Sequence, residues 1–258
     1  MILAIDVGNT NTVFGIFRRK KLIAYWRVST TTVRTEDECW LVLKLSLEQK
    51  SIRSEEISGV VISSVVPTVT TILEMMTMKY YRLAPVIVSA AIDIGLKIRY
   101  DTPEAVGADR LCNAVAAYKK YGGPCIVVDI GTATTYDVIS RRGEYLGGAI
   151  APGIETASTE LHRRTALLPK IQLRFPQNVI GMNTVTSMQS GVFYGALDAL
   201  EGMIARIQKV IGRKAPVIAT GGFSRLIVKK SKIIDHLEPN LVLEGAALIY
   251  ERVKGTSR

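Results

Sequence analysis

The chain has 258 residues, of which 48% are hydrophobic and 22% are charged, and its formal net charge is +10. This is the composition of a globular protein with one large domain or two modest ones. No apolar run reaches the roughly 18 residues of a membrane-spanning helix, and the short apolar N-terminus has no basic region ahead of it, as a signal peptide would. We therefore expect a cytoplasmic protein without a membrane partner.

The positive residues occur in short groups such as Arg18 to Lys21 rather than in one long basic tail. A basic surface that attracts anionic substrates, or a general solubility charge, is therefore favoured over nucleic-acid recognition. Three cysteines without Cys-x-x-Cys spacing and only two histidines argue against a disulfide framework, a zinc site and a histidine-based triad. We expect buried thiols in a reducing compartment.

Apolar runs bounded by turn residues predict strands, and capped amphipathic stretches predict helices. The first half is expected to contain strands at 2–5, from 13 on and at 22–28, a helix at 35–49, a strand at 59–63, a helix at 67–80 and a strand at 85–88. An alanine-rich helix at 111–121 follows. The second half is expected to contain strands at 125–130, 134–140 and 145–149, helices at 153–165 and 184–210, strands at 217–220 and 233–234, and a helix at 243–253.

The turn after the first strand combines a glycine with small polar residues, Gly8 followed by Asn9 to Thr12. Glycine lets the backbone approach a ligand closely, and the amides and hydroxyls that follow are donors of little bulk. Such a turn can hold an anion, of which phosphate is the usual one in a cell. An ordinary tight hairpin accounts for the same residues, so this segment alone leaves both interpretations open.

An internal repeat favours the phosphate turn. With a shift of 123 residues, Asp6 and Gly8 coincide with Asp129 and Gly131. Further matches are Thr12 with Thr135, Ile16 with Ile139, and Arg18-Arg19 with Arg141-Arg142. Because the order of elements repeats as well, the sequence predicts a duplicated α/β protein with halves at 1–115 and 116–258. The two Asp-x-Gly turns are expected to face each other across a cleft, where ligands commonly bind.

Two facing hairpins with phosphate-holding turns are typical of the superfamily of actin, the sugar kinases and the heat-shock chaperone ATPases, which this chain resembles. The resemblance implies duplicated ribonuclease H-like domains, each a mixed five-stranded sheet with helices. It also implies a glycine turn under the adenine of ATP. Gly221-Gly222, directly after the strand expected at 217–220, matches that turn.

Asp6 and Asp129 cannot simply face a polyphosphate, since like charges about 4 Å apart repel by roughly 4 kcal/mol even at an effective dielectric constant of about 20. The pair therefore implies a cation between carboxylate and phosphate, either Mg²⁺, a monovalent ion, or both. Strand-end aspartates that cap turns would explain one of the two residues but explain a matched pair poorly.

Phosphoryl transfer to an alcohol also needs a group that accepts the hydroxyl proton. Asp109 is the best candidate, because it lies between the two halves at a helix start, in Gly107-Ala108-Asp109-Arg110. Arg110 beside it could pair with an anionic substrate. On local grounds, an aspartate N-cap beside a surface arginine explains the same residues.

Along nearly its whole length the sequence resembles the type III pantothenate kinases. The resemblance is carried by Asp6 to Thr10, Trp26-Arg27 with Thr30, Ser64 to Pro67, Tyr100, Gly107 to Asn113, Asp129 to Thr135, Gly147 to Gly153 and Gly181 to Gly191. It implies an ATP-dependent phosphotransferase that converts the primary alcohol of pantothenate to 4′-phosphopantothenate, the first step of coenzyme A biosynthesis.

The resemblance also implies roles for single residues. The ATP phosphates would be held by Asp6, Val7, Gly8, Asn9, Thr10, Asn11, Thr12, Val13 and Thr132. Asp109 would be the catalytic base, Asp129 would bind potassium or ammonium, and Asp6 would be the second metal-binding carboxylate. Pantothenate would contact Tyr100, Gly107, Ala108, Asp109, Arg110 and Thr184. Members of the family resemble one another in being homodimers, so we expect this chain to be one.

Three alternatives are considered. A non-catalytic nucleotide-binding regulator is the first, because the family resembles proteins described as accessory factors for transcription and the chain is basic; loss of Asp109 or Asp129 would have favoured it, and both are present. A chaperone-like or filament-forming ATPase would need subdomains for which 258 residues leave little room. A sugar kinase would share the phosphate turns but not the arrangement of Tyr100 with Gly107 to Arg110.

Overall fold

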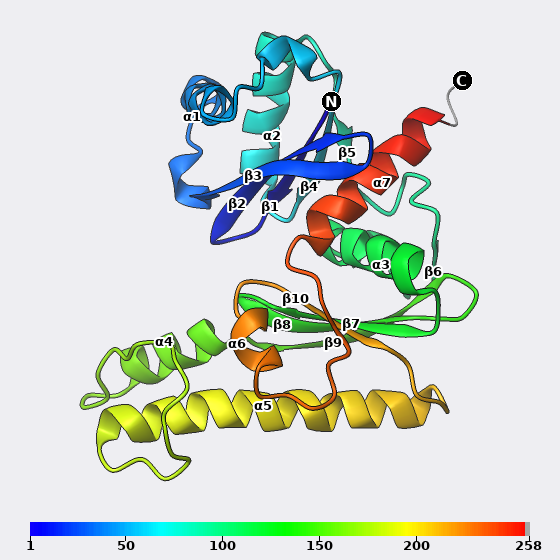
Figure 1. Ribbon diagram of the computed structural model, residues 1–258. Coiled ribbons are helices and arrows are strands. Elements are labelled where there is room, and N and C mark those ends of the chain that lie inside the picture. Colours follow the sequence, from blue (N-terminus) through cyan, green and yellow to red (C-terminus); the bar gives the residue numbers. More distant parts are fainter. Residues whose placement is uncertain (256–258) are drawn as a thin grey trace. The chain divides into compact units, whose positions relative to one another are not determined.

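The computed structural model describes residues 1–255. The chain forms two compact units (Figure 1), the first built from Met1–Lys120 together with the segment that begins at Leu241, and the second from Tyr121–Asn240. The sequence predicted a division between 115 and 116 with the last helix in the second half. In the structure that helix, α7 (Leu241–Gly255), packs against strands of the first unit instead.

The first unit contains a five-stranded sheet in the order β3-β2-β1-β4-β5. Its strands are β1 (Ile2–Val7), β2 (Asn11–Arg18), β3 (Lys21–Ser29), β4 (Gly59–Ser64) and β5 (Val86–Ile87). A further two-residue strand, β6 (Lys97–Ile98), does not belong to this sheet. Strands β1 to β3 pair antiparallel, whereas β1, β4 and β5 run parallel. This mixed sheet follows from tight turns in the first hairpins and helical connections afterwards.

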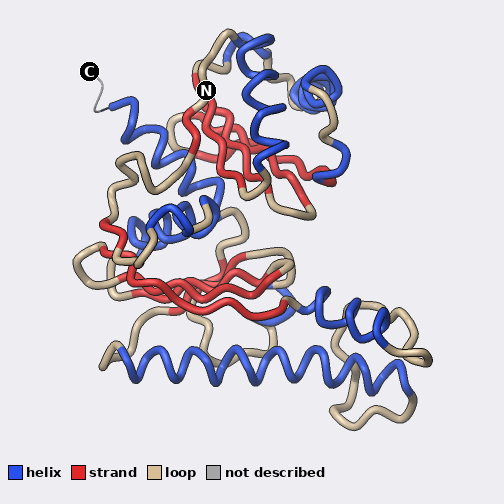
Figure 2. The backbone as a smooth tube through the Cα atoms, turned by 180° about the vertical axis from the view of Figure 1, so that it is seen from behind, coloured by secondary structure: helices blue, strands red, loops and turns tan. Residues whose placement is uncertain are grey.

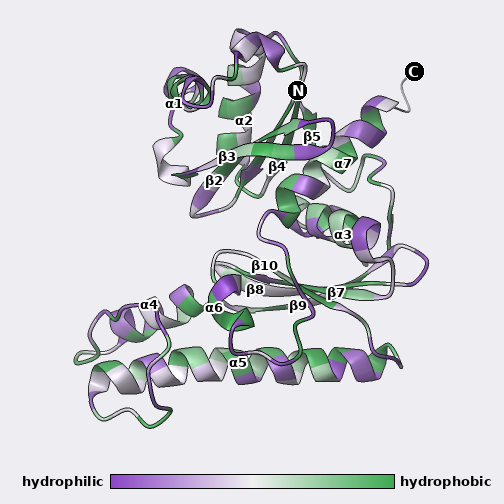
Figure 3. Cartoon of the chain, viewed as in Figure 1, coloured by the Kyte–Doolittle hydropathy of each residue, from purple (hydrophilic) through white to green (hydrophobic). Residues whose placement is uncertain are grey.

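Helices α1 (Glu36–Glu48), α2 (Pro67–Met76) and α7 pack on this sheet. The unit also contains α3 (Ala108–Tyr121), the π-helical turn η3 (Thr77–Tyr81) and the 3₁₀ turns η1 (Thr30–Thr32), η2 (Ser54–Glu56) and η4 (Pro103–Ala105). The hydrophobic core on one face joins β1, β2 and β4 to α1 and α2, and the strands are accordingly coloured hydrophobic in Figure 3. Helix α7 packs against β1 and β4, where glycines make room for it: a Cβ at Gly59 would lie 2.0 Å from Tyr250 Oη, and one at Gly15 would lie 2.9 Å from Leu243.

The second unit repeats this plan. Its strands are β7 (Cys125–Ile130), β8 (Ala133–Ile139), β9 (Glu144–Pro152), β10 (Val217–Thr220) and β11 (His236–Leu237), in the order β9-β8-β7-β10-β11. Its helices are α4 (Ile154–Arg164), α5 (Thr184–Val210) and α6 (Ser224–Val228). The long helix α5 runs along one face of the sheet (Figure 2), where Phe193, Leu197 and Leu200 join its core. Matching strand orders and directions in the two units identify the fold as a duplication.

Two sequence expectations are corrected in the second unit. The last strand lies at His236–Leu237 rather than at 233–234, because the backbone of Asp235 pairs with Val217 and places the following residues beside β10. Ile233 and Ile234 are apolar because they pack against the core, not because they form the ladder.

The second correction concerns the repeat. Val7 opposes Thr12, whereas its counterpart Ile130 opposes Thr134. The second turn is therefore one residue shorter, and after the turn the structural equivalent of Thr12 is Thr134 rather than Thr135. Both Thr12 and Thr134 are buried, as expected for residues at matching positions. A constant sequence offset could not reveal a deletion inside the turn.

Within residues 1–255, no helix combines the length and apolar character needed to cross a membrane. The three cysteines are free and buried, as the sequence predicted.

Candidate active site

The first turn predicted to hold phosphate is a loop between β1 and β2 that backbone hydrogen bonds brace. The N–H of Gly8 donates to the carbonyl of Asn11 at 3.0 Å. Thr30 stabilises the turn through two hydrogen bonds: its N–H donates to the Thr10 carbonyl at 3.0 Å, and its hydroxyl donates to the Gly8 carbonyl at 2.6 Å. The hydroxyl of Thr12 lies 3.1 Å from that of Thr30. These bonds hold the turn in one conformation.

The residues predicted to hold ATP phosphates differ in accessibility. Asn9, Thr10 and Asn11 are exposed, and Asp6, Gly8 and Val13 are partly buried. Val7 and Thr12 are buried, so the side chain of Thr12 braces the turn from inside. The exposed part of the turn is thus made of short polar side chains and backbone amides, which suits an anion.

Asp6 lies in β1 next to a buried serine of β4 that the sequence reasoning did not single out. The register of the two parallel strands places Asp6 opposite Ser63. Ser63 is fully buried, and its hydroxyl donates to Asp6 Oδ1 at 3.4 Å. No sequence signal indicates this contact, because it depends on which strand lies beside β1.

Asp109 lies within the first turn of α3, which begins at Ala108, three residues earlier than the sequence predicted. Its Oδ1 accepts a hydrogen bond from the backbone N–H of Arg110 at 2.8 Å. A Cβ at Gly107 would lie 2.5 Å from that same oxygen, so glycine leaves room for the carboxylate. Arg110 is only 7% exposed. Asp109 beside a buried arginine differs from the local alternative, an N-cap beside a surface arginine.

The pKa of Asp109 is raised, because burial disfavours its ionised form more than the backbone N–H of Arg110 and the nearby guanidinium favour it. Burial also raises the pKa of Cys112, one helical turn further along α3, well above its ordinary value. The charges of Asp6 and Asp109 add to the rise in the pKa of Cys112, whereas the Ser63 hydroxyl opposes it. One cluster in the first unit therefore contains both the carboxylate of the phosphate turn and the predicted base.

The second phosphate turn lies between β7 and β8 and packs against the predicted adenosine turn. The N–H of Gly131 donates to the Ala133 carbonyl at 3.0 Å. Gly221 has a φ of +91°, and a Cβ there would lie 2.3 Å from Asp129 Oδ1 and 2.6 Å from the backbone nitrogen of Ile130. A side chain is therefore excluded at Gly221 both by backbone conformation and by the carboxylate of Asp129.

Thr132 is exposed at the tip of this turn, and the start of α4 holds it in place. The N–H of Gly153 and the hydroxyl of Thr156 both donate to the Thr132 carbonyl, at 3.1 and 2.6 Å. A Cβ at Gly153 would lie 2.2 Å from the Gly131 carbonyl oxygen. The missing side chain thus lets the helix start approach the turn closely.

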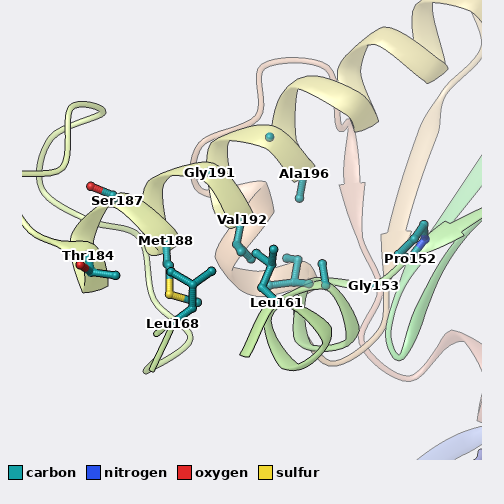
Figure 4. Close-up of a pocket in the computed structure, with 13 residues that line it drawn as sticks. Pro152, Gly153, Leu161, Leu168, Thr184, Ser187, Met188, Gly191, Val192 and Ala196 are labelled. Atoms are coloured by element: carbon teal, nitrogen blue, oxygen red, sulfur yellow. The ribbon is translucent and has the colours of Figure 1, made fainter. Parts of the chain in front are cut away.

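A pocket of about 670 Å³ extends from this helix start toward Thr184. Its lining is mainly apolar and comes from α4 and α5; in Figure 4 the side chains of Leu161, Leu168 and Met188 point into it. Thr184, at the first position of α5, lines the opposite end and is itself exposed. The pocket therefore connects the neighbourhood of Thr132 with the residue predicted to contact pantothenate.

A buried carboxylate in the second unit also lies outside the sequence predictions. Asp137 in β8 is fully buried, accepts a hydrogen bond from Tyr145 Oη at 2.7 Å and another from Thr135 Oγ1 at 3.3 Å. Thr135 is the residue opposite Asp129 in the ladder. Asp137 thus braces the strand beside the second turn.

The predicted site residues fall into separate groups. The first unit contains Asp6 to Val13 and Gly107 to Arg110, together with Tyr100, which is 37% exposed in the loop after β6. The second unit contains Asp129, Thr132, Gly221-Gly222 and Thr184. That Asp6 and Asp129 face each other therefore stays a prediction.

The acidic residues of the site suit a cation that is coordinated mainly by nucleotide phosphates and water, with few protein ligands. Among residues 1–255 there is no group of three or more side chains of His, Cys, Asp or Glu that could hold a metal ion. Mg²⁺ in nucleotide sites is commonly bound through one or two carboxylates, with phosphate and water completing its coordination. Single, partly buried carboxylates such as Asp6 and Asp129 fit this role.

Known proteins resemble the chain in both sequence and fold. A solved structure of an inorganic polyphosphate/ATP-glucomannokinase from Arthrobacter superposes with a TM-score of 0.52 at 15% identity, covering 96% of each chain. Such a likeness shows the fold alone, and it agrees with the predicted duplicated ribonuclease H-like architecture.

The sequence comparisons are more specific. The type III pantothenate kinases of Moorella thermoacetica and Halalkalibacterium halodurans are 48% and 45% identical to this chain over 252 residues, which is 98% of this chain and 99% of each relative. A family model described as type III pantothenate kinase matches residues 2–206, which include the first turn, the Asp109 segment and the second turn. The chain therefore belongs to the type III pantothenate kinase family.

Proposed function

We propose that this protein transfers a phosphoryl group from ATP to the primary alcohol of pantothenate, the first step of coenzyme A biosynthesis. Besides family membership, one observation supports this function: the Asp109 segment lies against the same end of β4 that holds Asp6, since Ser63 donates to Asp6 Oδ1 and a Cβ at Gly107 would lie 3.4 Å from Val65 Cγ1 and 2.5 Å from Asp109 Oδ1. A kinase needs such proximity, because its base must act next to the transferred phosphate.

Asp109 acts as the base. Its carboxylate accepts the proton of the substrate hydroxyl while the oxygen attacks the phosphorus in line with the leaving group. A raised pKa makes Asp109 a better proton acceptor than an exposed aspartate. The hydrogen bond from the backbone of Arg110 orients the carboxylate, and the guanidinium of Arg110 suits the substrate carboxylate.

The remaining residues bind and orient the two substrates. The first turn, from Asp6 to Val13, and Thr132 of the second turn hold the ATP phosphates, and Gly221-Gly222 leaves space for the adenosine. Pantothenate contacts Tyr100, Gly107 to Arg110, and Thr184.

Two cations complete the site. We assign Mg²⁺ to Asp6 and a monovalent cation, K⁺ or NH₄⁺, to Asp129. Their positive charge offsets the repulsion between these carboxylates and the phosphates.

We also propose that the protein is a cytoplasmic homodimer and that the surface around the end of α4 and the start of α5 joins the two copies. Large apolar side chains are exposed there, among them Leu167 (90%), Ile180 (79%) and Met182 (88%). Exposed apolar side chains in such numbers indicate an interaction site. Because Thr184 adjoins this surface, pairing would bring it close to the partner. Met182→Glu should yield a monomer by light scattering, and an unchanged dimer would contradict the assignment.

The decisive experiment is an assay of purified protein with pantothenate and ATP, in Mg²⁺ with either K⁺ or Na⁺. We expect phosphopantothenate, and faster turnover with K⁺. Asp109→Asn should abolish turnover while its circular dichroism spectrum and gel-filtration volume remain those of the parent. Absence of product from folded parent protein would refute the function, and near-normal turnover by the variant would refute the base.

The regulator alternative is not favoured. Loss of Asp109 or Asp129 would have favoured a regulator, and both residues are present. The relatives at 45–48% identity are named as kinases.

A further inference from the structure

Ser63 occupies a position that only the folded sheet creates. It lies at the end of β4, directly opposite Asp6 of β1, and its side chain is fully buried. Its hydroxyl donates to Asp6 Oδ1 at 3.4 Å. Asp6 itself is only partly buried, so one carboxylate oxygen is bonded from inside the protein while the group remains accessible from outside.

The helix α3 begins close to the same end of β4, since a Cβ at Gly107 would lie 3.4 Å from Val65 Cγ1. Cys112 lies on α3 three positions after Asp109 and is fully buried, and the Ser63 hydroxyl lowers the pKa of its thiol while burial raises it. Both Asp6 and Asp109 lie near enough to Cys112 to raise its pKa. Ser63 therefore lies beside Asp6 at the end of β4 next to which the helix carrying Asp109 begins.

We propose that Ser63 is a positioning residue that orients the Asp6 carboxylate for the magnesium–nucleotide complex. A carboxylate next to a cation binds it best when one of its oxygens is held by a fixed donor, because the donor selects one rotamer. This inference rests on the role proposed above for Asp6 and adds a residue to which the resemblance gave no role.

The neighbouring serine provides a matched control. Ser64 is on the same strand, but its hydroxyl accepts hydrogen bonds from the N–H of Val66 at 3.1 Å and from Thr70 Oγ1 at 2.7 Å. These bonds brace the start of α2 and do not involve Asp6. Removing either hydroxyl deletes one oxygen atom from the same strand, but the two hydroxyls have different partners; Ser63 is fully buried and Ser64 is partly buried.

The experiment measures binding of ADP by calorimetry with Mg²⁺ and with EDTA, in the parent, Ser63→Ala, Ser64→Ala and Cys112→Ala. The ratio of the two affinities reports the coupling between metal and nucleotide. Loss of a residue that orients a metal ligand typically costs at least about tenfold, so Ser63→Ala should reduce the ratio by roughly that factor. Ser64→Ala and Cys112→Ala should leave it unchanged, even where they lower the melting temperature.

A double-mutant cycle with Asp6→Asn distinguishes positioning from general destabilisation. If Ser63 acts through Asp6, Ser63→Ala has no further effect on the ratio once Asp6 is Asn. An unchanged ratio in Ser63→Ala, or an equal loss in the Asp6→Asn background, would overturn the proposal. Because the assay contains no pantothenate, it decides the role of Ser63 even if the parent protein fails to phosphorylate pantothenate.

Discussion

The adjacent glycines 221 and 222 allow a sharp test of the nucleotide site proposed for the second unit. Gly221 has a φ of +91°, and a Cβ added to it would lie 2.3 Å from Asp129 Oδ1. A Cβ added to Gly222 would meet no atom within 4 Å. The two substitutions to alanine add the same methyl group at consecutive positions, so a difference between them reports the local structure alone.

Two terms set the expected cost of Gly221→Ala. A non-glycine residue in this backbone region costs about 1 to 3 kcal/mol, and forcing a methyl group against packed atoms costs a further 1 to 3 kcal/mol or so. Together they lower the free energy of unfolding by about 2 to 6 kcal/mol. For a chain of this size that corresponds to a fall in melting temperature of roughly 5 to 20 °C. Gly222→Ala should change stability by about 0.5 kcal/mol or less.

The measurement is thermal unfolding by circular dichroism of the parent and both variants, followed by the KM for ATP of whatever remains folded. Because the added methyl group displaces Asp129, Gly221→Ala should also raise the KM for ATP and weaken the response to K⁺. If Gly221→Ala melts within 2 °C or so of Gly222→Ala, the glycine turn does not pack against Asp129 as the structure indicates, and its assignment to the nucleotide site loses its support.

Three further predictions concern the first unit and the long helix. Burial raises the pKa of Asp109 above its ordinary value of 3.8. Ionisation of Asp109 therefore destabilises the folded state as the pH rises from the pKa of the unfolded chain through that of the folded protein. Asp109→Asn should be more stable to urea than the parent at pH 7, and the difference in stability should shrink toward acid pH. The acid limb of kcat/KM should have an apparent pKa above 3.8, and a lower one would contradict the role of Asp109 as base. Gly107→Ala should displace the Asp109 carboxylate, since the new Cβ would lie 2.5 Å from its oxygen, and should lower kcat by about 100-fold with little loss of stability; full activity would show that the carboxylate tolerates the shift. Asn183→Ala should cost about 1 kcal/mol in urea unfolding, because the Asn183 side chain accepts from the N–H of Thr186 at 2.9 Å; Asn183→Ser, which keeps a capping oxygen, serves as the control and should cost less.

Local sequence signals determined much of the fold. The apolar run of β1 ends in a glycine turn, and a capping threonine with acidic residues starts α1. Such signals act over a few residues and need no tertiary contact. The repeated Asp-x-Gly turns and the element order also predicted the duplication, because each copy encodes the same supersecondary structure.

Contacts between distant segments were decided only by the tertiary structure. Helix α7 belongs with the first sheet because Gly15 and Gly59 leave space for its side chains, yet neither glycine indicates its partner in sequence. The short β11 is placed by its pairing with β10, which its own residues do not encode. The one-residue difference between the turns likewise appears only in the strand register.

In the candidate site, too, some features could be predicted from the sequence and others depend on tertiary contacts. The two turns, Asp109 and the glycine pair could be predicted as site residues from the sequence, because each is a compact motif and the first turn recurs after 123 residues. The sequence could not indicate Ser63, since a serine at the end of a buried strand acquires meaning only when the parallel pairing with β1 places it beside Asp6. Nor could it predict that Gly221 lies against Asp129, a contact between residues 92 positions apart. Residue chemistry is encoded locally, whereas the orientation of each functional group depends on neighbours that only the folded chain supplies.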